Sequence, residues 1–313
     1  MGFQFAQDTT PTSLQIRLRL IGVLILLGVG WGSTQALGKM AVSTGHQHFG
    51  LIFWQATIGV IVLGALNLVR RKHFALNLAG LRFACIIACI GTLIPNSTFY
   101  ISVAHLPSGV MSILISTIPM LSLPMALGLG MDKLHPLRLL GLVCGLVGVA
   151  LIALPRSSLP TPEMAAWLPL AMVGPVFYAL EGNYVAKWGM AGLDAVQAMF
   201  WASLVAALLA LPLTLGLGQW IDPRPPYALP ELALMASSTI HALMYAAYVW
   251  LAAKAGAVFA TQTSYVVTLS GVLWAMWLLD EHFSAWVWAA MAVMLVGLFL
   301  VQPQQGKNAL LAG

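Results

Sequence analysis

Long apolar runs, separated by short polar turns, follow one another along almost the whole chain. Ten of these runs are long enough to form membrane-spanning helices, each of which needs about 20 mainly apolar residues. They cover residues 18–38, 49–69, 82–104, 108–130, 137–154, 167–187, 194–218, 231–253, 257–279 and 285–302. Arg17 and Arg19 precede the first run, which is longer than the apolar core of a signal peptide and indicates an uncleaved helix. The pattern predicts an all-α polytopic membrane protein with ten transmembrane helices.

Composition supports this class and excludes a soluble one. Of the 313 residues, 60% are hydrophobic and only 7% are charged, whereas a soluble domain carries about 25% charged residues. The formal net charge is +5, but the basic residues lie at the ends of the apolar runs, which is typical of topology signals. We therefore expect the lipid bilayer as a partner, and no nucleic acid.

The distribution of basic residues predicts the orientation of the chain. If the N-terminus is inside, the inner segments hold eleven Lys and Arg residues and the outer segments hold three, Lys39, Arg156 and Arg224. Positively charged residues are enriched on the cytoplasmic side of membrane proteins. Ten spans then place both termini in the cytoplasm.

The runs divide into two sets of five at residues 155–166, PRSSLPTPEMAA, the one long and linker-like connection. The turn and run at 131–152 align with those at 279–301, and Asp132 falls on Asp280. The openings of the two sets, GWGSTQALGK and FYALEGNYVAK, match more loosely. The chain therefore contains a predicted internal repeat.

An internal repeat with an odd number of spans must be inverted, because the second copy begins on the opposite side of the membrane. Inverted repeats are the architecture of alternating-access transporters, which hold the substrate near the bilayer midplane. The predicted units are a first five-helix repeat at 14–154, a linker at 155–166 and a second five-helix repeat at 167–302. The predicted fold is thus a 5+5 inverted repeat.

One acidic residue, Glu181, lies inside the sixth run, in the segment VFYALEGNYVAKW. Insertion of an acidic residue at the centre of a transmembrane helix costs about 3 kcal/mol. In a helix over 167–187, Glu181 lies ~6 Å from the midplane and has no easy path to the headgroups. Tyr178 and Tyr184 are three residues before and after it and share its face. The pattern predicts a carboxylate framed by aromatic rings.

Other polar and aromatic side chains within the apolar runs are expected to face the bundle interior, because they are costly against lipid. His241, Tyr245 and Tyr248 share one face of the eighth run. The remaining candidates lie on the first, third and ninth runs: Trp31, Gln35, Asn96, Tyr100, Gln262 and Tyr265.

Glu181 and the aromatic residues favour a substrate with a cationic or amino group. A cation over an aromatic face gains about 0.5–2 kcal/mol, so amines, amino-acid-like zwitterions and quaternary ammonium compounds are favoured. Burial disfavours the charged form of a carboxyl group, which makes Glu181 the candidate for proton coupling as well. The alternative for Glu181 is a protonated or hydrogen-bonded residue that joins two helices. Interhelical packing is the alternative for His241, Tyr245 and Tyr248.

Other kinds of site find little support. The segment GHQH at 45–48 has two His residues without Cys or acidic partners, which is typical of a solvated turn, so we expect no metal. There is no nucleotide-binding motif, no HExxH and no nucleophile elbow. We therefore expect neither an enzyme nor a bound cofactor.

These features together resemble the drug/metabolite transporter (DMT) superfamily and, within it, the ten-helix EamA-type transporters. The resemblance rests on the two sets of five runs, on WGSTQALGK at 31–39, and on an acidic turn before a glycine-rich fifth or tenth run, and it covers about 18–302. The chain departs at Thr34, where the family often has Asn, and at Asp132–Lys133, where it often has Glu.

The resemblance implies a basket of two five-helix halves around a central cavity. Helices 1–4 and 6–9 would line the cavity, and helices 5 and 10 would be peripheral. It further implies a multi-pass protein of the bacterial inner membrane, as a monomer or homodimer, that moves a small amphipathic metabolite, most often outward.

Two alternatives remain for the function. The family also contains sugar-nucleotide and sugar-phosphate carriers, so one alternative is a carrier of a neutral or anionic metabolite by facilitated exchange. A non-transporting membrane scaffold is the alternative of another class. Polar residues on at least five separate runs argue against a scaffold, which would avoid their cost.

Overall fold

The computed structural model describes residues 13–255 and 257–301, and these residues form helices joined by turns, with no β-strand among them. The elements are, in order, α1 (Ser13–Ala41), α2 (His48–Val69), α3 (Leu78–Ile87), η1 (Ala88–Leu93), α4 (Ile94–His105), α5 (Ser108–Ile115), α6 (Ile118–Gly128), α7 (Pro136–Ala153), η2 (Pro162–Trp167), α8 (Leu168–Trp188), α9 (Ala195–Gly216), α10 (Leu229–Ala255), α11 (Ala257–Thr261), α12 (Thr263–Leu279) and α13 (Ala285–Val301).

The apolar runs of the sequence form helices in the structure. Within the described residues, eight helical stretches are long and apolar enough to cross a membrane. The last two apolar helices, α12 and α13, have 17 residues each. The prediction of an all-α polytopic membrane protein is confirmed at this level.

Two of the predicted runs are interrupted where proline removes a backbone donor. In the third run, Ile94 N–H bonds to Cys89 O, five residues back, so that η1 is a π-helical turn between α3 and α4. Pro95 follows and has no N–H to offer the next carbonyl. In the fourth run, α5 ends at Ile115 and α6 begins again just before Pro119.

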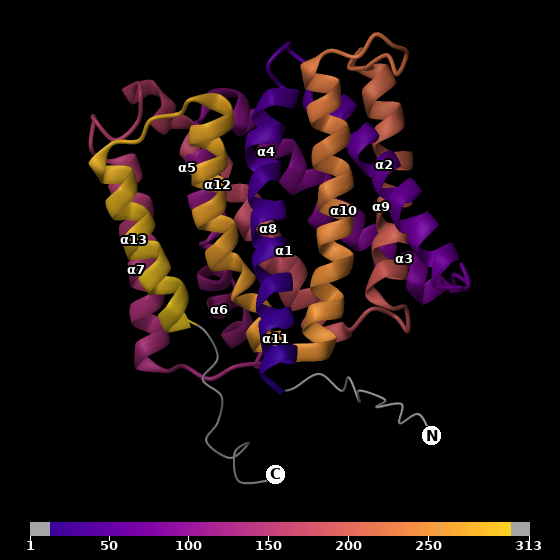
Figure 1. Cartoon of the computed structure of the whole chain (residues 1–313), viewed down its shortest axis with the longest axis horizontal. Helices are drawn as coiled ribbons and strands as arrows, with labels where there is room; N and C mark the ends of the chain where they lie inside the picture. Colours follow the sequence, from indigo (N-terminus) through magenta and orange to yellow (C-terminus); the bar gives the residue numbers. More distant parts are fainter. Residues whose placement is uncertain (1–12, 256, 302–313) are drawn as a thin grey trace, which may run out of the picture.

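The helices stand side by side with their connections at two ends (Figure 1). The upper end in this view carries the connection between α7 and α8, and we call it the linker end. The lower end, where α1 begins and α13 ends, we call the base. The first and last described helices therefore have their outer termini at the same end of the bundle.

The packing of the helices follows a regular scheme. α1 packs against α10 and α12, while α8 packs against α4 and α6. α2 packs along α9, and α7 packs along α13. Glycines allow the last pair to approach closely: a Cβ atom at Gly148 would lie 2.4 Å from Cγ of Met294. Small residues have this role between transmembrane helices.

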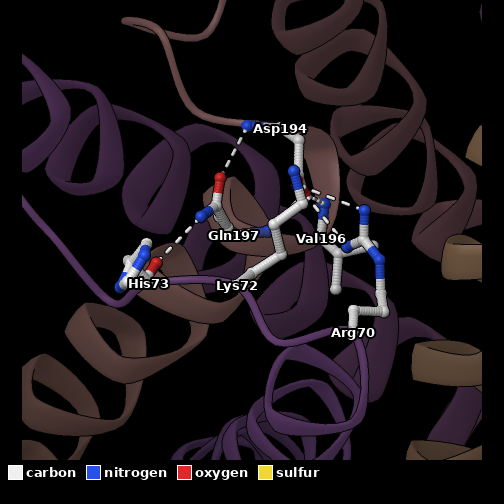
Figure 2. Close-up of polar contacts among 6 residues, drawn as sticks. All are labelled: Arg70, Lys72, His73, Asp194, Val196 and Gln197. Carbon is white, nitrogen blue, oxygen red and sulfur yellow. Dashed lines mark hydrogen bonds and ion pairs between the residues drawn. The ribbon is translucent and has the colours of Figure 1, made fainter.

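The α2–α9 pair is held at the base by a polar cluster around Asp194 (Figure 2). The Asp194 carboxylate accepts hydrogen bonds from both terminal nitrogens of Arg70, each at 3.2 Å, and Lys72 Nζ lies 3.7 Å from it. Gln197 completes a capping box at the start of α9 and donates to His73 O. At the linker end, Thr214 Oγ1 donates to Phe49 O. The pair is thus tied at both ends.

Candidate substrate cavity

A cavity of about 410 Å³ lies between the helices. Its lining comes mainly from α1, α4, α5, α8, α10 and α12, with single residues from η1, α2, α6 and α9. Within the described chain, α7 and α13 contribute nothing to the lining, which agrees with the expectation that the fifth and tenth spans are peripheral.

Nine of the twelve predicted site residues line this cavity, although they come from four separate stretches of the sequence. They are Trp31, Gln35, Asn96, Tyr100, Tyr178, Glu181, His241, Tyr245 and Tyr248. The expectation that polar and aromatic residues in the apolar runs face the bundle interior therefore holds for these positions.

The other three predicted residues lie outside the lining. Tyr184 is one turn closer to the base than Glu181, and its ring packs against Phe83 and Trp188 with centroid separations of 6.1 and 5.0 Å. Gln262 is exposed at the junction of α11 and α12. Tyr265 packs against an apolar cluster beside the cavity. Sequence spacing gives the face of a helix correctly but not how far along its axis a cavity extends.

Glu181 lies against the π-helical turn η1. A Cβ atom on Gly91 would be 2.6 Å from both Cδ and Oε1 of Glu181, so a larger residue at this position would displace the carboxylate from where it lies. Among the described residues, no hydrogen bond or ion pair to Glu181 occurs, and its partial exposure is to the cavity. π-helical turns are frequent at functional sites, and this one brings Gly91 and Glu181 together.

Two hydrogen bonds between helices fix other side chains of the lining. Tyr178 Oη donates to Asn96 Oδ1 at 3.1 Å, and Tyr100 Oη donates to Gln55 Oε1 at 2.8 Å. These bonds join α8 to α4 and α4 to α2. They hold two of the aromatic rings in defined positions at the cavity wall.

The first helix presents polar atoms that the protein itself does not satisfy. Within the described residues, Trp31 Nε1 and Gln35 Oε1 are buried without a hydrogen-bond partner. The two side chains are one helical turn apart and both line the cavity. Buried polar groups are normally paired, so this donor and this acceptor are available to a bound molecule after a small adjustment.

An aromatic wall lines the cavity from α1 and α10. The Trp31 ring lies 6.1 Å from the His241 ring and 5.4 Å from the Tyr248 ring, all with tilted planes. Tyr245 also lines the cavity on α10. Tilted aromatic contacts of this kind stabilise the wall and leave ring faces that suit an apolar or cationic group.

Gln55 and Gly91 are among the lining residues that were not predicted from the sequence. Gln55 is a polar residue within the second apolar run, and that signal alone would have been enough to select it. Gly91 has no comparable signal, because its role depends on the carboxylate of a helix 90 residues further along the chain.

The charges of the lining have one sign. Glu181 is the one carboxylate among the described lining residues, and Lys and Arg are absent from that lining. His241 is the other ionisable group apart from the tyrosines. The cavity can therefore place a negative charge, but no permanent positive charge, beside a bound molecule.

Comparison with known proteins agrees with this architecture. One solved structure, described only as the crystal structure of a protein, superposes with a TM-score of 0.62 at 18% identity and covers 90% of this chain and 96% of that chain. At this identity the likeness concerns the fold alone. None of the curated proteins compared with the chain matches it.

A family model provides the assignment. The model of the EamA-like transporter family matches the chain twice, over residues 18–154 and 165–302. Members of this family are membrane transporters of the drug/metabolite type, and the apolar helices fit a multi-pass membrane protein. The chain belongs to the EamA-like transporter family.

Proposed function

We propose that the protein is a secondary transporter that binds a small organic cation in the cavity and moves it outward by alternating access. The substrate class comprises amines, amino-acid-like compounds and quaternary ammonium compounds. Glu181 binds the cationic group, and the aromatic wall of α1 and α10 packs against the apolar part. In this proposal ten helices cross the membrane as two inverted sets of five, at 14–154 and 167–302, joined by the linker at 155–166.

The observation that carries the proposal is that, among the described residues, the carboxylate of Glu181 has no partner and the lining has no Lys or Arg. A carboxylate removed from bulk water is costly unless it meets a cation or a proton. A substrate ammonium group supplies the first of these and a coupling proton supplies the second. The two can alternate on one carboxylate, which is how Glu181 would couple export to proton entry.

The same lining argues against an anionic substrate. Phosphate and carboxylate groups are bound in proteins chiefly by Arg, Lys and backbone N–H groups, and the described lining offers one carboxylate instead. A sugar phosphate would have to approach Glu181 without a compensating cation. The cavity is therefore better suited to a cation than to the phosphorylated substrates of the sugar-phosphate alternative.

The helix packing supports the inverted repeat. In a 5+5 inverted repeat, α1 corresponds to α8, α10 to the third span (α3, η1 and α4), and α12 to the fourth (α5 and α6). The contacts obey this correspondence, because α1 packs on α10 and α12 whereas α8 packs on α4 and α6. The pairs α2–α9 and α7–α13 each relate an element to its own counterpart.

We further propose that the base faces the cytoplasm of a bacterial inner membrane and the linker end faces outward. Basic residues support this orientation, since Arg70, Arg71 and Lys72 follow α2 at the base and Lys133 follows α6 there. The linker end holds Lys39, Arg156 and Arg224. Lys and Arg are thus more frequent at the base than at the linker end, as is typical of the cytoplasmic side of a membrane protein.

The test of this proposal is Glu181→Gln, measured on the full chain in liposomes. Gln keeps the size of the side chain and its hydrogen bonding, but it cannot ionise. The variant should bind cationic substrates about 5- to 150-fold more weakly, which corresponds to roughly 1–3 kcal/mol for one charge-assisted hydrogen bond. The panel contains labelled amines, amino acids, quaternary ammonium compounds and sugar phosphates, assayed with and without a pH gradient. Glu163→Gln, at an exposed site outside the cavity, is the matched control.

Three results are distinguishable in this experiment. Weaker binding of cations supports the substrate role, and loss of gradient-driven transport with intact exchange supports the proton role. Wild-type binding and transport in Glu181→Gln, at normal folded yield, would refute both roles and leave the residue as a structural contact. Preferential binding of sugar phosphates by the wild type would refute the cation proposal.

A further inference from the structure

Two groups of helices face each other across the cavity. We call α1, α10 and α12 the α1 group, and α4, α5, α6 and α8 the α8 group. Within the groups, α1 packs on α10 and α12, and α8 packs on α4 and α6, whereas α5 continues the chain between α4 and α6 and packs most extensively on α12 of the α1 group. The α4–α5 junction, residues 104–109, belongs to the α8 group and lies at the linker end.

The α1 group binds both sides of this junction with two charged side chains. Lys39 Nζ, near the end of α1, donates to Leu106 O at 2.9 Å and to Ala104 O at 3.3 Å. Glu281, just after α12, accepts hydrogen bonds from Ser108 N at 2.7 Å and Gly109 N at 3.0 Å. We call this set of contacts the linker-end latch.

The latch is electrostatically matched to its target. The last carbonyls of α4 and the first N–H groups of α5 have no partners within their own helices. A lysine at a helix C-terminus and a carboxylate at a helix N-terminus also have the favoured signs for the helix dipoles. The Cβ of any larger residue at Gly109 would clash with Phe283, at 2.3 Å from its Cζ, so the two groups are in close contact here.

The counterparts of these residues can be found from the repeat. Asp132 and Asp280 are 148 positions apart, and so are Lys39 and Lys187. The same interval relates Tyr100 to Tyr248, and both of these line the cavity. Applied to the junction, it relates Leu106, at the end of α4, to Lys254, at the end of α10. A latch at the base would therefore join Lys187 to the end of α10.

In this structure Lys187 has a different partner. Lys187 Nζ donates to Leu129 O at 3.1 Å, just after α6 and within its own α8 group. Lys39, by contrast, reaches from the α1 group to the α8 group. The two corresponding lysines thus occupy acceptors that do not correspond. This difference is what an alternating-access protein shows when one end is closed and the other is open.

We propose that Lys39 and Glu281 hold the linker end shut, that this structure represents the base-open state, and that Lys187 moves from Leu129 O to the end of α10 when the latch opens. The two lysines then act as alternating closures at opposite ends of the cavity. This inference rests on the proposed transport function, since it assigns a state in the transport cycle.

The sequence also indicates which state is favoured at rest. The counterpart of Glu281 is Lys133, also 148 positions away, so the base lacks the carboxylate that caps α5 at the linker end. The neighbouring Asp132 is paired with Arg138 within its own segment. The linker-end latch therefore has two charged members and the base closure has one, which favours the base-open state without substrate.

The α2–α9 pair gives an internal control, because both of its helices lie outside the α1 and α8 groups. It is held at the base by Arg70 and Asp194 (Figure 2) and at the linker end by Thr214 and Phe49. Loss of the Asp194 carboxylate should lower stability without opening either end.

The test measures spin-label distances in liposomes on the full chain, with Cys85, Cys89 and Cys144 replaced by Ala. One label pair, at Ser43 and Ala104, spans the linker end between α1 and α4. The other, at Trp188 and Lys254, spans the base between α8 and α10. All four positions are exposed. No substrate is needed, so failure of this test is distinguishable from failure of the proposed substrate.

Lys39→Gln and Glu281→Gln should each raise the ratio of open to closed molecules at the linker end by roughly 10- to 100-fold, the effect of losing charge-assisted hydrogen bonds. The distance across the base should shorten in the same molecules. Lys39→Arg, which keeps the charge and the donors, should preserve the wild-type distances, and Asp194→Asn should leave both distributions unchanged. Adding Lys187→Gln to Lys39→Gln should reduce the population closed at the base.

Each other result overturns part of the inference. Unchanged linker-end distances in both Gln variants would show that the latch does not hold this end. Opening at the linker end without shortening at the base would show that Lys187 does not exchange acceptors. If Lys39→Gln does not fold, the same criteria apply to Glu281→Gln, with Lys39→Arg as the variant that keeps the wild-type distances.

Discussion

Replacement of Asp194 separates two ways in which one side chain stabilises the base of the bundle. Its carboxylate accepts from the backbone N–H groups of Val196 and Gln197, which begins α9, and it also pairs with Arg70 from the end of α2 (Figure 2). Asp194→Ala removes both interactions. Asp194→Asn keeps a side-chain oxygen for the cap but removes the charge, so the pair of variants resolves the two contributions.

The expected magnitudes follow from the geometry. Loss of an N-cap costs about 1 kcal/mol of unfolding free energy, within a range of roughly 0.5–2. The side chains of Arg70 and Asp194 are 35% and 29% exposed, so their ion pair has the value of a surface pair, about 0.2–1 kcal/mol. Asp194→Asn should therefore cost about 0.2–1 kcal/mol, and Asp194→Ala about 1–3 kcal/mol.

The dependence on pH has a defined sign. Partial burial by itself would raise the pKa of Asp194, but hydrogen bonds from Gln197 N–H and Arg70, with the charges of Arg70 and Lys72, hold that pKa below its ordinary value. A carboxyl group with a lowered pKa stabilises the fold above its unfolded pKa of about 3.9, and this stabilisation is lost as the pH falls through the folded pKa. The stability difference between wild type and Asp194→Asn should thus be constant near neutral pH and decline as the pH falls below about 4, toward the lowered folded pKa.

The assay is reversible unfolding of the purified protein in mixed detergent micelles, followed by tryptophan fluorescence from pH 3 to pH 8. Arg70→Gln and the double variant complete a cycle whose coupling energy should equal the ion-pair contribution. If Asp194→Ala costs no more than Asp194→Asn, the cap contributes nothing and the reasoning fails. A wild-type advantage over Asn that does not decline as the pH falls below about 4 would refute the electrostatic part.

Two further predictions concern helix packing and topology. Gly32→Ala should destabilise the fold by about 1–3 kcal/mol, because a Cβ atom there would lie 2.2 Å from Ser270 Oγ and 2.8 Å from Gly271 N of α12. The control is Gly22→Ala on the same helix. It should be nearly neutral, because a Cβ atom at Gly22 would have no other atom within 4 Å. Equal stabilities of the two variants in the same unfolding assay would contradict the tight α1–α12 contact. A cysteine at Ser157 should react in intact cells with a membrane-impermeant maleimide, whereas one at Lys72 should react only after permeabilisation; the reverse result would invert the proposed orientation.

Much of the fold follows from local sequence. The apolar runs predict helices because a chain in lipid must satisfy its backbone groups within each segment, and within the described residues these runs are mostly helical. The internal breaks of the third and fourth runs have a local cause as well, since Pro95 and Pro119 remove donors. The π-helical geometry of η1 does not follow from a proline alone, because its hydrogen-bond register is set by the packing around it.

Most of the candidate site residues were predictable because polar and aromatic side chains are costly to place against lipid. Glu181, His241, Tyr245 and Tyr248 are expensive against lipid, so their positions in apolar runs predict an interior environment, and they line the cavity. Tyr184 satisfies the same rule yet packs on Phe83, because the cavity ends before that turn of α8.

What the sequence by itself determined is therefore the set of helices, the repeat, the family and most of the residues that avoid lipid. Only the tertiary structure decided which of them meet. Gly91 makes room for Glu181, and Glu281 caps α5 at Ser108, across sequence separations of 90 and 173 positions. The physical reason is that periodicity fixes the direction in which a side chain leaves its own helix. The atoms that it meets there depend on the position and depth of a different helix.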